Sequence, residues 1–233
     1  MSETVHDRTL ALIGATGLER LKASTVCVLG VGGVGSYAIE GLARAGIGSL
    51  VIVDPAKVDV TNINRQIIAL HSTVGRYKVE VSGERIHDIN PEIRVTAHSV
   101  CACRGNLPGM IPESCGYIID AMDSVAAKVD VALYARDNGI PLISCMGTGN
   151  KLDPAGFLIT DISATKVCPL AKKMRTELKK AGIDKLTVLY SEELPKGKRD
   201  QCISSISFVP ASAGLRLAGH VIRSLLGIAE GDV

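Results

Sequence analysis

The sequence predicts an α/β fold with a Rossmann-like, mainly parallel sheet flanked by helices. Two observations support this class. Short apolar segments rich in Val, Ile and Leu alternate with amphipathic segments through about residue 145, as strands alternate with helices in a parallel sheet. The first apolar segment also runs directly into a glycine-rich turn, Gly30–Gly35, which is followed by a helical pattern.

The predicted elements follow one another in that alternating order. Residues 8–23 are expected to form a helix, since Leu10, Ile13, Leu18 and Leu21 recur at roughly helical spacing. Strands are expected at 25–29, 50–53, 94–98, 117–119 and 141–144. Helices are expected between them at 36–45, 74–89 and 124–138.

The pattern changes after Cys145. Two strands at 157–160 and 186–190 are expected in a smaller part of antiparallel character. A basic helix at 170–181 and an amphipathic helix at 213–226 accompany them. No linker separates two independent units. We therefore predict a single domain over residues 1–233, with a main core at about 8–146 and a smaller C-terminal α+β portion at about 147–233.

The composition indicates a globular protein with an aliphatic core. Of the 233 residues, 46% are apolar and 21% are charged, a balance that excludes a disordered chain. Aromatic residues make up only 3%, so Val, Ile, Leu and Ala must fill the interior. The net charge of +2 is too small to indicate a nucleic-acid partner by itself. Residues 166–200, however, hold ten Lys or Arg against five Asp or Glu.

The cysteines and the N-terminal residues favour a reducing, cytoplasmic compartment. The seven cysteines are odd in number and contain no Cys-x-x-Cys pair, which fits neither a disulfide framework nor a two-pair zinc site. Residues 1–8 lack the apolar segment of a signal peptide, and no run of 18 apolar residues predicts a membrane span. We expect the thiols to be small buried hydrophobes, with a metal or redox role for Cys101 and Cys103 as the lesser alternative. Cys202 receives no catalytic assignment.

The glycine turn predicts a nucleotide site. Gly30, Gly32, Gly33 and Gly35 allow a tight turn and let a phosphate approach the backbone, while the following helix offers its N–H groups to the anion. Asp54 ends the next strand, where a carboxylate accepts hydrogen bonds from ribose hydroxyls. The alternative is a turn that only packs a helix against a strand. These residues alone do not separate ATP from NAD.

A second group of charged residues favours ATP. Arg65 lies in the loop after the Asp54 strand, and Lys78 lies on the helix that follows. Both are suited to hold the β- and γ-phosphates, and Asp123, just beyond a later strand, is suited to Mg²⁺. Taken one at a time, each has an ordinary alternative as a solvated cation or a helix N-cap. A NAD-dependent oxidoreductase needs no such clamp, so that hypothesis is disfavoured.

The order of these motifs resembles the ATP-binding set of the ubiquitin-activating-enzyme superfamily, which includes the ThiF-type adenylyltransferases. The residues that carry the resemblance are Gly30, Gly32, Gly33, Gly35, Asp54, Asn62, Asn64, Arg65, Gln66, Lys78, Asp123 and Ser124. Further segments, among them Ala69–Gly75, Asp88–Glu92 and Ser205–Pro210, look like the branch of tRNA threonylcarbamoyladenosine dehydratases. Cys168 departs from the pattern of that branch, which has an Asp before Pro-Leu-Ala.

The resemblance implies a single ThiF-like domain that uses ATP and Mg²⁺ and takes tRNA as its substrate. A carboxylate is adenylated with release of pyrophosphate, and the carbamoyl nitrogen then closes a ring. The implied catalytic residues are Arg8, Arg65, Lys78 and Asp123, with Asp123 holding the metal. In the superfamily an N-terminal arginine reaches the ATP of the neighbouring subunit, and Arg8 occupies the matching position, which implies a homodimer.

Two other functions stay open at this point. One is an adenylyltransferase that activates the C-terminus of a ubiquitin-like sulfur-carrier protein through the same ATP site. The other is an ATP-binding scaffold that docks a cysteine desulfurase system. The basic window at 166–200 is expected to face tRNA phosphates in the dehydratase, against the alternative of a solvated helix face.

Overall fold

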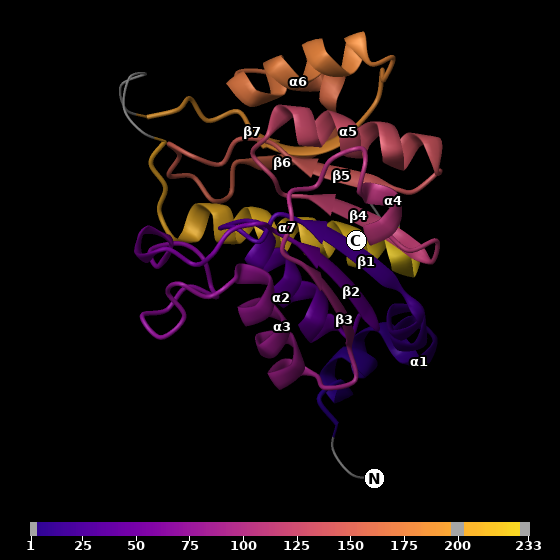
Figure 1. Ribbon diagram of the computed structural model, residues 1–233. Coiled ribbons are helices and arrows are strands. Elements are labelled where there is room, and N and C mark those ends of the chain that lie inside the picture. Colours follow the sequence, from indigo (N-terminus) through magenta and orange to yellow (C-terminus); the bar gives the residue numbers. More distant parts are fainter. Residues whose placement is uncertain (1–3, 197–202, 229–233) are drawn as a thin grey trace.

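The computed structural model describes residues 4–196 and 203–228, which contain a seven-stranded sheet (Figure 1). The strands are β1 (Thr25–Leu29), β2 (Ser49–Val53), β3 (Arg94–His98), β4 (Cys115–Asp120), β5 (Leu142–Cys145), β6 (Phe157–Asp161) and β7 (Thr187–Ser191). Their order across the sheet is β3-β2-β1-β4-β5-β7-β6. All neighbours run parallel except β6 and β7, which pair antiparallel.

Helices cover both faces of this sheet. They are α1 (Asp7–Ala23), α2 (Gly35–Ala45), α3 (Lys78–Ile89), α4 (Leu107–Met110), α5 (Val125–Asp137), α6 (Pro169–Lys180) and α7 (Phe208–Leu226), with short 3-10 turns at Val60–Asn62 and Ile162–Ala164. Val26 and Val28 of β1 join the core under α2 and α7, whereas Cys27 and Leu29 join the core under α4 and α5. Of the helices that the structure describes, none combines the length and the hydropathy needed to cross a membrane.

The predicted α/β class and the order of the predicted elements are confirmed, but the short helix α4 was not predicted, two helices differ in extent and two strands differ in pairing. The helix expected at 74–89 begins at Lys78, because Tyr77 is extended and forms an isolated bridge with Lys57. The helix expected at 213–226 begins at Phe208. The strands expected at 157–160 and 186–190 do pair antiparallel, but β7 also lies parallel to β5. They therefore extend the main sheet and form no sheet of their own within the described residues.

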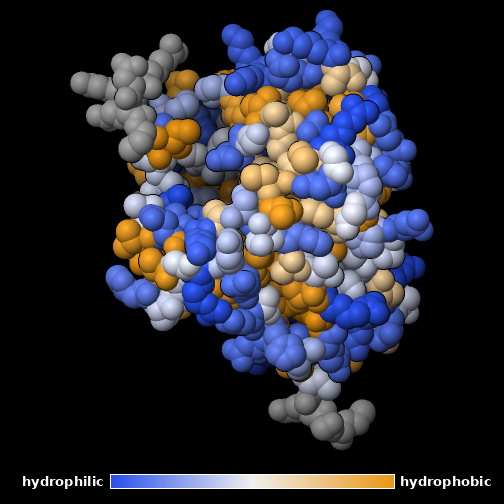
Figure 2. Space-filling view, in the orientation of Figure 1, coloured by the Kyte–Doolittle hydropathy of each residue, from blue (hydrophilic) through white to orange (hydrophobic). Residues whose placement is uncertain are grey.

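The topology decides where a ligand binds. From β1 the chain builds outward through β2 and β3, and it then returns to the other side of β1 through β4 and β5. The carboxyl ends of β1 and β4 therefore form a topological switch point, the place at which open α/β sheets bind ligands. Figure 2 shows the surface hollowed at the left of the molecule, on the side where these strands end in Figure 1.

Candidate nucleotide-binding site

The glycine turn after β1 lies against the end of β4, across the switch point. Gly30 has a φ of +92°, and a Cβ at this position would lie 2.7 Å from the carbonyl oxygen of Ala121. A Cβ on Gly35 would overlap the carbonyl oxygen of Gly30. Backbone atoms therefore exclude side chains at both positions, which lets the turn start α2 directly beside β4.

Helix α7 packs on the same turn from the other side. A Cβ on Gly33 would lie 3.2 Å from Cβ of Pro210, and a Cβ on Gly214 would overlap the carbonyl oxygen of Val34. Further along, a Cβ on Gly41 of α2 would lie 2.8 Å from Cβ of Ala218. Helices α2 and α7 are thus packed as closely as their backbones allow, and the shape of the turn depends on both.

The turn presents backbone donors that are not used elsewhere. Within residues 4–196 and 203–228, no hydrogen bond takes up the N–H groups of Gly32, Gly33 or Val34. A Cβ on Gly32 would meet open space. These N–H groups precede the first turn of α2, where the helix dipole adds partial positive charge. A phosphate fits this arrangement.

Asp54, at the end of β2, ties the glycine turn to the next loop. Its Oδ2 accepts the N–H of Val31 at 2.7 Å, and its Oδ1 accepts the N–H of Ala56 at 2.8 Å. The residue is 7% exposed. Both oxygens therefore already hold the backbone in place, and the ribose contact predicted for Asp54 would use their remaining lone pairs.

The segment after Asp54 contains two buried polar side chains, Asn62 and Gln66. Asn62 Oδ1 accepts the N–H of Asp59 at 3.1 Å and completes a capping box around the 3-10 turn. Gln66 Oε1 is buried and has no hydrogen-bond partner among the described residues. Four polar residues were predicted in this segment: Asn62, Asn64, Arg65 and Gln66. Gln66 differs from the others because its buried acceptor has no donor in the described chain, and such an acceptor needs one.

Arg65 lies against the glycine turn. A Cβ on Gly33 would be 3.4 Å from Cγ of Arg65, so the arginine stem packs on the turn. Its Nη1 donates to the carbonyl oxygen of Thr61 at 2.8 Å and to Asn64 Oδ1 at 2.9 Å. Asn64 in turn donates to the carbonyl oxygen of Ser205 at 3.0 Å. The remaining donors of the guanidinium have no partner in the described chain and are available to an anion.

Lys78 is a largely buried residue that contacts the same loops. Its N–H donates to the carbonyl oxygen of Ala56 at 3.0 Å, and the residue is only 9% exposed. No ion pair to Lys78 occurs among the described residues. Hydrogen bonds from Thr61 hold the pKa of Asp59 below its usual value, and the Lys78 charge adds to that effect. An ammonium without a direct partner, carried on a largely buried stem, is suited to bind a phosphate.

Asp123 and Ser124 follow the end of β4 and differ in role. Ser124 is the N-cap of α5, and its Oγ accepts the N–H of Ala127 at 3.4 Å. Asp123 is exposed. No group of three His, Cys, Asp or Glu side chains that could hold a metal occurs in the part of the chain that the structure describes. Asp123 therefore offers one carboxylate, which suits Mg²⁺ because this ion commonly completes its shell with water and substrate phosphates.

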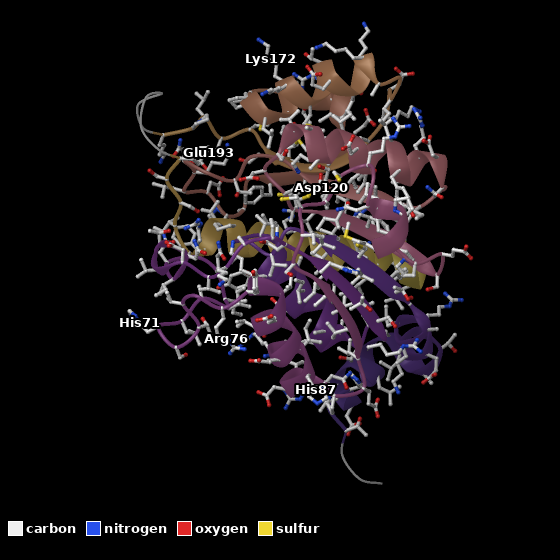
Figure 3. The ribbon with its side chains drawn as sticks, in the orientation of Figure 1. His71, Arg76, His87, Asp120, Lys172 and Glu193 are labelled. Atoms are coloured by element: carbon white, nitrogen blue, oxygen red, sulfur yellow. The ribbon has the colours of Figure 1, made fainter. Side chains whose placement is uncertain are left out.

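A buried ion pair that the sequence analysis missed joins Asp120 and Lys128, which lie on either side of Asp123 in the sequence. Lys128 Nζ donates to Asp120 Oδ2 at 3.0 Å, to Ser144 Oγ at 3.2 Å and to the carbonyl oxygen of Cys145 at 2.8 Å. Neither charged side chain is more than 1% exposed. Figure 3 shows Asp120 in the middle of the molecule. Asp120 Oδ1 also accepts the N–H of Met122 at 3.1 Å, so the pair anchors the segment that carries Asp123.

A signal for this pair was present in the helical spacing. Lys128, Val131, Ala132 and Ala135 are three, four and seven residues apart and are all buried, so Lys128 belongs to the apolar stripe of α5. A lysine in such a stripe requires a buried partner. Asp120, at the end of the preceding strand, is that partner.

Arg8 does not join the other predicted residues within one chain. A Cβ on Gly46 would lie 3.1 Å from the ring of His6, and His6 Nε2 lies 3.3 Å from Asn90 Nδ2. Gly46 and Asn90 cap the carboxyl ends of α2 and α3. Because α2 has 11 residues, its two ends are about 16 Å apart. Arg8, which is exposed and two residues beyond His6, thus lies at the end of the helical layer opposite the glycine turn.

The cysteines divide into two groups. Cys27, Cys115, Cys145 and Cys168 are buried, as expected, and burial raises the pKa of Cys145 to about 12, which disfavours the nucleophilic thiolate. Cys101 and Cys103 are exposed, so the expectation of burial is wrong for them. They join no metal-binding group in the described chain. Cys202 lies outside the described residues.

The chain is similar over most of its length to several proteins named tRNA threonylcarbamoyladenosine dehydratase. It is 44% identical over 232 residues to the tRNA threonylcarbamoyladenosine dehydratase of Bacillus subtilis strain 168, which covers 92% of this chain and 91% of that protein. The crystal structure of the E. coli tRNA N6-threonylcarbamoyladenosine dehydratase TcdA with AMP matches with a TM-score of 0.89 and 35% identity, over 97% of this chain and 98% of that chain. The same protein with ATP matches with a TM-score of 0.89 and 36% identity, over 94% and 93%.

These matches confirm the resemblance that the sequence motifs indicated. The ThiF family model matches residues 6–233, a range that includes every predicted site residue from Arg8 to Ser124. The similarity is therefore not confined to the glycine turn, which many nucleotide-binding folds share. The chain belongs to the ThiF family.

Proposed function

We propose that the protein is an ATP-dependent dehydratase that cyclises N6-threonylcarbamoyladenosine in tRNA. One observation carries the proposal: three kinds of group lie around the switch point of the sheet. They are the free N–H groups of the glycine turn, the unpaired Lys78 ammonium and the exposed Asp123 carboxylate. These groups suit a nucleoside triphosphate with a divalent cation. The names of its close relatives support the choice of substrate.

The proposed reaction has two steps. An oxygen of the threonine carboxylate attacks the α-phosphorus of ATP, which forms the acyl-adenylate and releases pyrophosphate. The carbamoyl nitrogen then attacks the activated carbonyl carbon, loses its proton and expels AMP. The nucleoside thereby loses one water, whose oxygen leaves in AMP. Activation is required because a carboxylate is a poor electrophile, and AMP is a far better leaving group than oxide.

The residues of the site would act mainly by positioning and by neutralising charge. The N–H groups of Gly32 and Gly33 would bind phosphate oxygens, and Arg65 and Lys78 would neutralise the β- and γ-phosphates. Asp54 would accept a ribose hydroxyl. Gln66 would gain the donor that its buried Oε1 lacks among the described residues, which gives this side chain a role in recognising the nucleotide or the substrate.

Mg²⁺ fits the residues at the end of β4. Asp123 would hold the ion together with phosphate oxygens and water, and the buried Asp120–Lys128 pair would keep its loop in place. When bound, Mg²⁺ would supply positive charge that polarises the phosphates. The rest of the chemistry belongs to the protein's own groups.

The opposite location of Arg8 supports a homodimer in which Arg8 reaches the ATP of the partner. Within one chain it lies about 16 Å or more from the glycine turn, along α2. The test is to mix two inactive variants, Arg8→Ala and Asp123→Ala. Mixed dimers should regain activity, because one of their two sites is then complete. If mixing restores nothing although the subunits exchange, Arg8 does not act across the dimer.

The experiment that tests the function is mass spectrometry of the nucleosides of tRNA treated with the protein and MgATP. The tRNA is taken from cells that lack the cyclic modification. Loss of one water from threonylcarbamoyladenosine, dependent on ATP, is the expected result. If the nucleoside is unchanged, and ATP–pyrophosphate exchange occurs only when a protein with a Gly-Gly tail is added, the protein is instead an adenylyltransferase of a sulfur carrier.

A further inference from the structure

Helix α6 and the turn before it carry an unbalanced positive charge. Residues 166–180 contain six Lys or Arg and a single acidic residue, Glu177. The apolar side of α6 is buried through Ala171, Met174 and Leu178. The opposite side is exposed and carries the lysines Lys172, Lys173, Lys179 and Lys180, and Lys166 is exposed in the preceding turn.

Most of these charges have no partner within the protein. Glu177 pairs with Lys180 at 2.8 Å, and Arg175 donates to the carbonyl oxygen of Thr165 at 3.0 Å. Lys166, Lys172, Lys173 and Lys179 form no ion pair with any residue in the described ranges. In Figure 3 the Lys172 side chain points away from the body of the molecule. We call these four residues the α6 lysine face.

The α6 lysine face begins at the edge of the sheet that carries the nucleotide site. A Cβ on Gly147, two residues beyond β5, would lie 3.7 Å from Cys168 Sγ and 3.9 Å from Cβ of Leu170. The first turn of α6 is therefore at the carboxyl end of β5, next to β4 in the sheet. From there the helix extends about 18 Å over its 12 residues, so Lys172 and Lys179 are about 10 Å apart along its axis.

We propose that the α6 lysine face binds phosphates of the tRNA backbone and so holds the substrate while its modified nucleoside enters the site. This inference rests on the proposed function. Charge complementarity supports it, because unpaired, exposed lysines over about two turns of a helix match a ligand with regularly spaced phosphates. Such contacts give affinity and orientation without reading sequence. The choice of nucleoside remains with the site at the switch point.

The test compares two double variants with the same change in net charge. Lys172→Glu/Lys173→Glu reverses two charges of the face, and Lys22→Glu/Arg104→Glu reverses two exposed charges outside α6. Binding of tRNA is measured by fluorescence anisotropy over a range of salt concentrations, and ATP binding by calorimetry. The α6 variant should bind tRNA about tenfold or more weakly, and its slope of log K against log salt should be shallower by about 0.9 for each phosphate that it no longer neutralises. ATP affinity should stay unchanged.

Each outcome has a separate meaning. Normal tRNA affinity and salt slope in the α6 variant would overturn the proposal, as would an equal loss in the control variant, since the effect would then be one of net charge. A third probe is polyglutamate: if the α6 variant loses affinity for polyglutamate but not for tRNA, the face serves an acidic protein and the proposal fails. Failure of the wild-type protein to bind or modify tRNA would instead refute the proposed function.

The conservative variant Lys172→Arg/Lys173→Arg sharpens the result. Arginine keeps the charge and also binds phosphate, so tRNA affinity should be retained. Loss of affinity in this variant would mean that the shape of the face, and not its charge, governs binding, which contradicts the proposal.

Discussion

The aspartates at the ends of β2 and β4 hold neighbouring loops in different ways. Asp54 accepts two backbone N–H groups and keeps some contact with solvent. Asp120 is fully buried, accepts one backbone N–H group and pairs with the buried Lys128. A carboxylate that is fully removed from water needs a counter-charge, whereas one that keeps some contact with solvent can be satisfied by backbone N–H groups. The β4 side of the site is thus fixed by charge and the β2 side by backbone hydrogen bonds.

The largest effect is expected from breaking the charge pair on the β4 side. Lys128→Met leaves Asp120 buried without its cation, so the free energy of unfolding should fall by about 3–5 kcal/mol. Chemical denaturation measures this change. The double variant Asp120→Asn/Lys128→Met removes both charges and should recover a large part of the loss. A fall of less than about 1 kcal/mol in the single variant would mean that the pair contributes little.

The next largest effect concerns activity and not stability. Asp123→Ala removes the exposed carboxylate three residues after Asp120 and should lower ATP-dependent turnover by about 100-fold or more, while unfolding changes by less than about 0.5 kcal/mol. Arg65→Ala should behave similarly. The measurement pairs the rate of water loss from the nucleoside with a denaturation curve for each variant. Full activity in either variant would show that the phosphates and the metal bind elsewhere.

A smaller effect is expected on the β2 side. Asp54→Ala leaves the N–H groups of Val31 and Ala56 without their acceptor, which should cost about 1–3 kcal/mol in unfolding free energy and also weaken ATP binding. Asp7→Ala serves as the matched control, because Asp7 accepts hydrogen bonds only from the nearby Thr4 and is exposed. Its effect should be clearly smaller than that of Asp54→Ala. If Asp54→Ala destabilises as much as Lys128→Met, the contrast between the two sides is wrong.

The smallest effect involves Glu40 of α2, a carboxylate with two partly exposed partners. Arg44 Nε and Arg85 Nε each donate to it at 2.7 Å. Burial alone would raise the pKa of Glu40, but the hydrogen bonds from Arg85 and Arg44 outweigh it and hold the pKa below 4.5. The folded state thus gains stability from the ionised form above pH 4.5 and loses it as pH falls through the lowered pKa.

Glu40→Gln should therefore cost about 1 kcal/mol near neutral pH, and this difference from the wild type should shrink on acidification. Denaturation curves at neutral pH and below pH 4.5 measure both values. A difference that is the same at both would mean that the side chain acts through packing and not through charge.

The sequence was most informative where the chemistry is local. Apart from the short helix α4, strands and helices up to residue 145 were predicted with their order, because each depends on a short periodic pattern and on glycines beside it. The first turn of α7 was missed because the helical pattern was recognised only from Ala213, and only the structure shows that Pro210 packs on Gly33. The burial of Lys128 was missed because a lysine on a helix ordinarily faces water.

The sequence pattern did not predict which segments lie side by side when they are far apart in the chain. The strands after residue 147 were expected in a part of their own, yet β7 adds to β5, and this pairing joins residues far apart in the sequence, such as Ile143 and Thr187. Arg8 was grouped with the ATP site through the family resemblance alone. Its distance from the glycine turn follows from the packing of His6 beside Gly46, which no local pattern encodes.

The packing of α7 on the glycine turn has a consequence for how the protein is made. Residues 30–35 leave the ribosome early, but Pro210 and Gly214, which fit against them, follow only after every strand. At about 5–20 residues per second, roughly 9 to 35 s separate the two segments. During that interval α7 does not yet cover the apolar side of α2, so the nascent chain exposes an apolar surface. Chaperone binding during synthesis is therefore expected to concentrate on the stage at which β1 to β5 are complete and α7 is still absent.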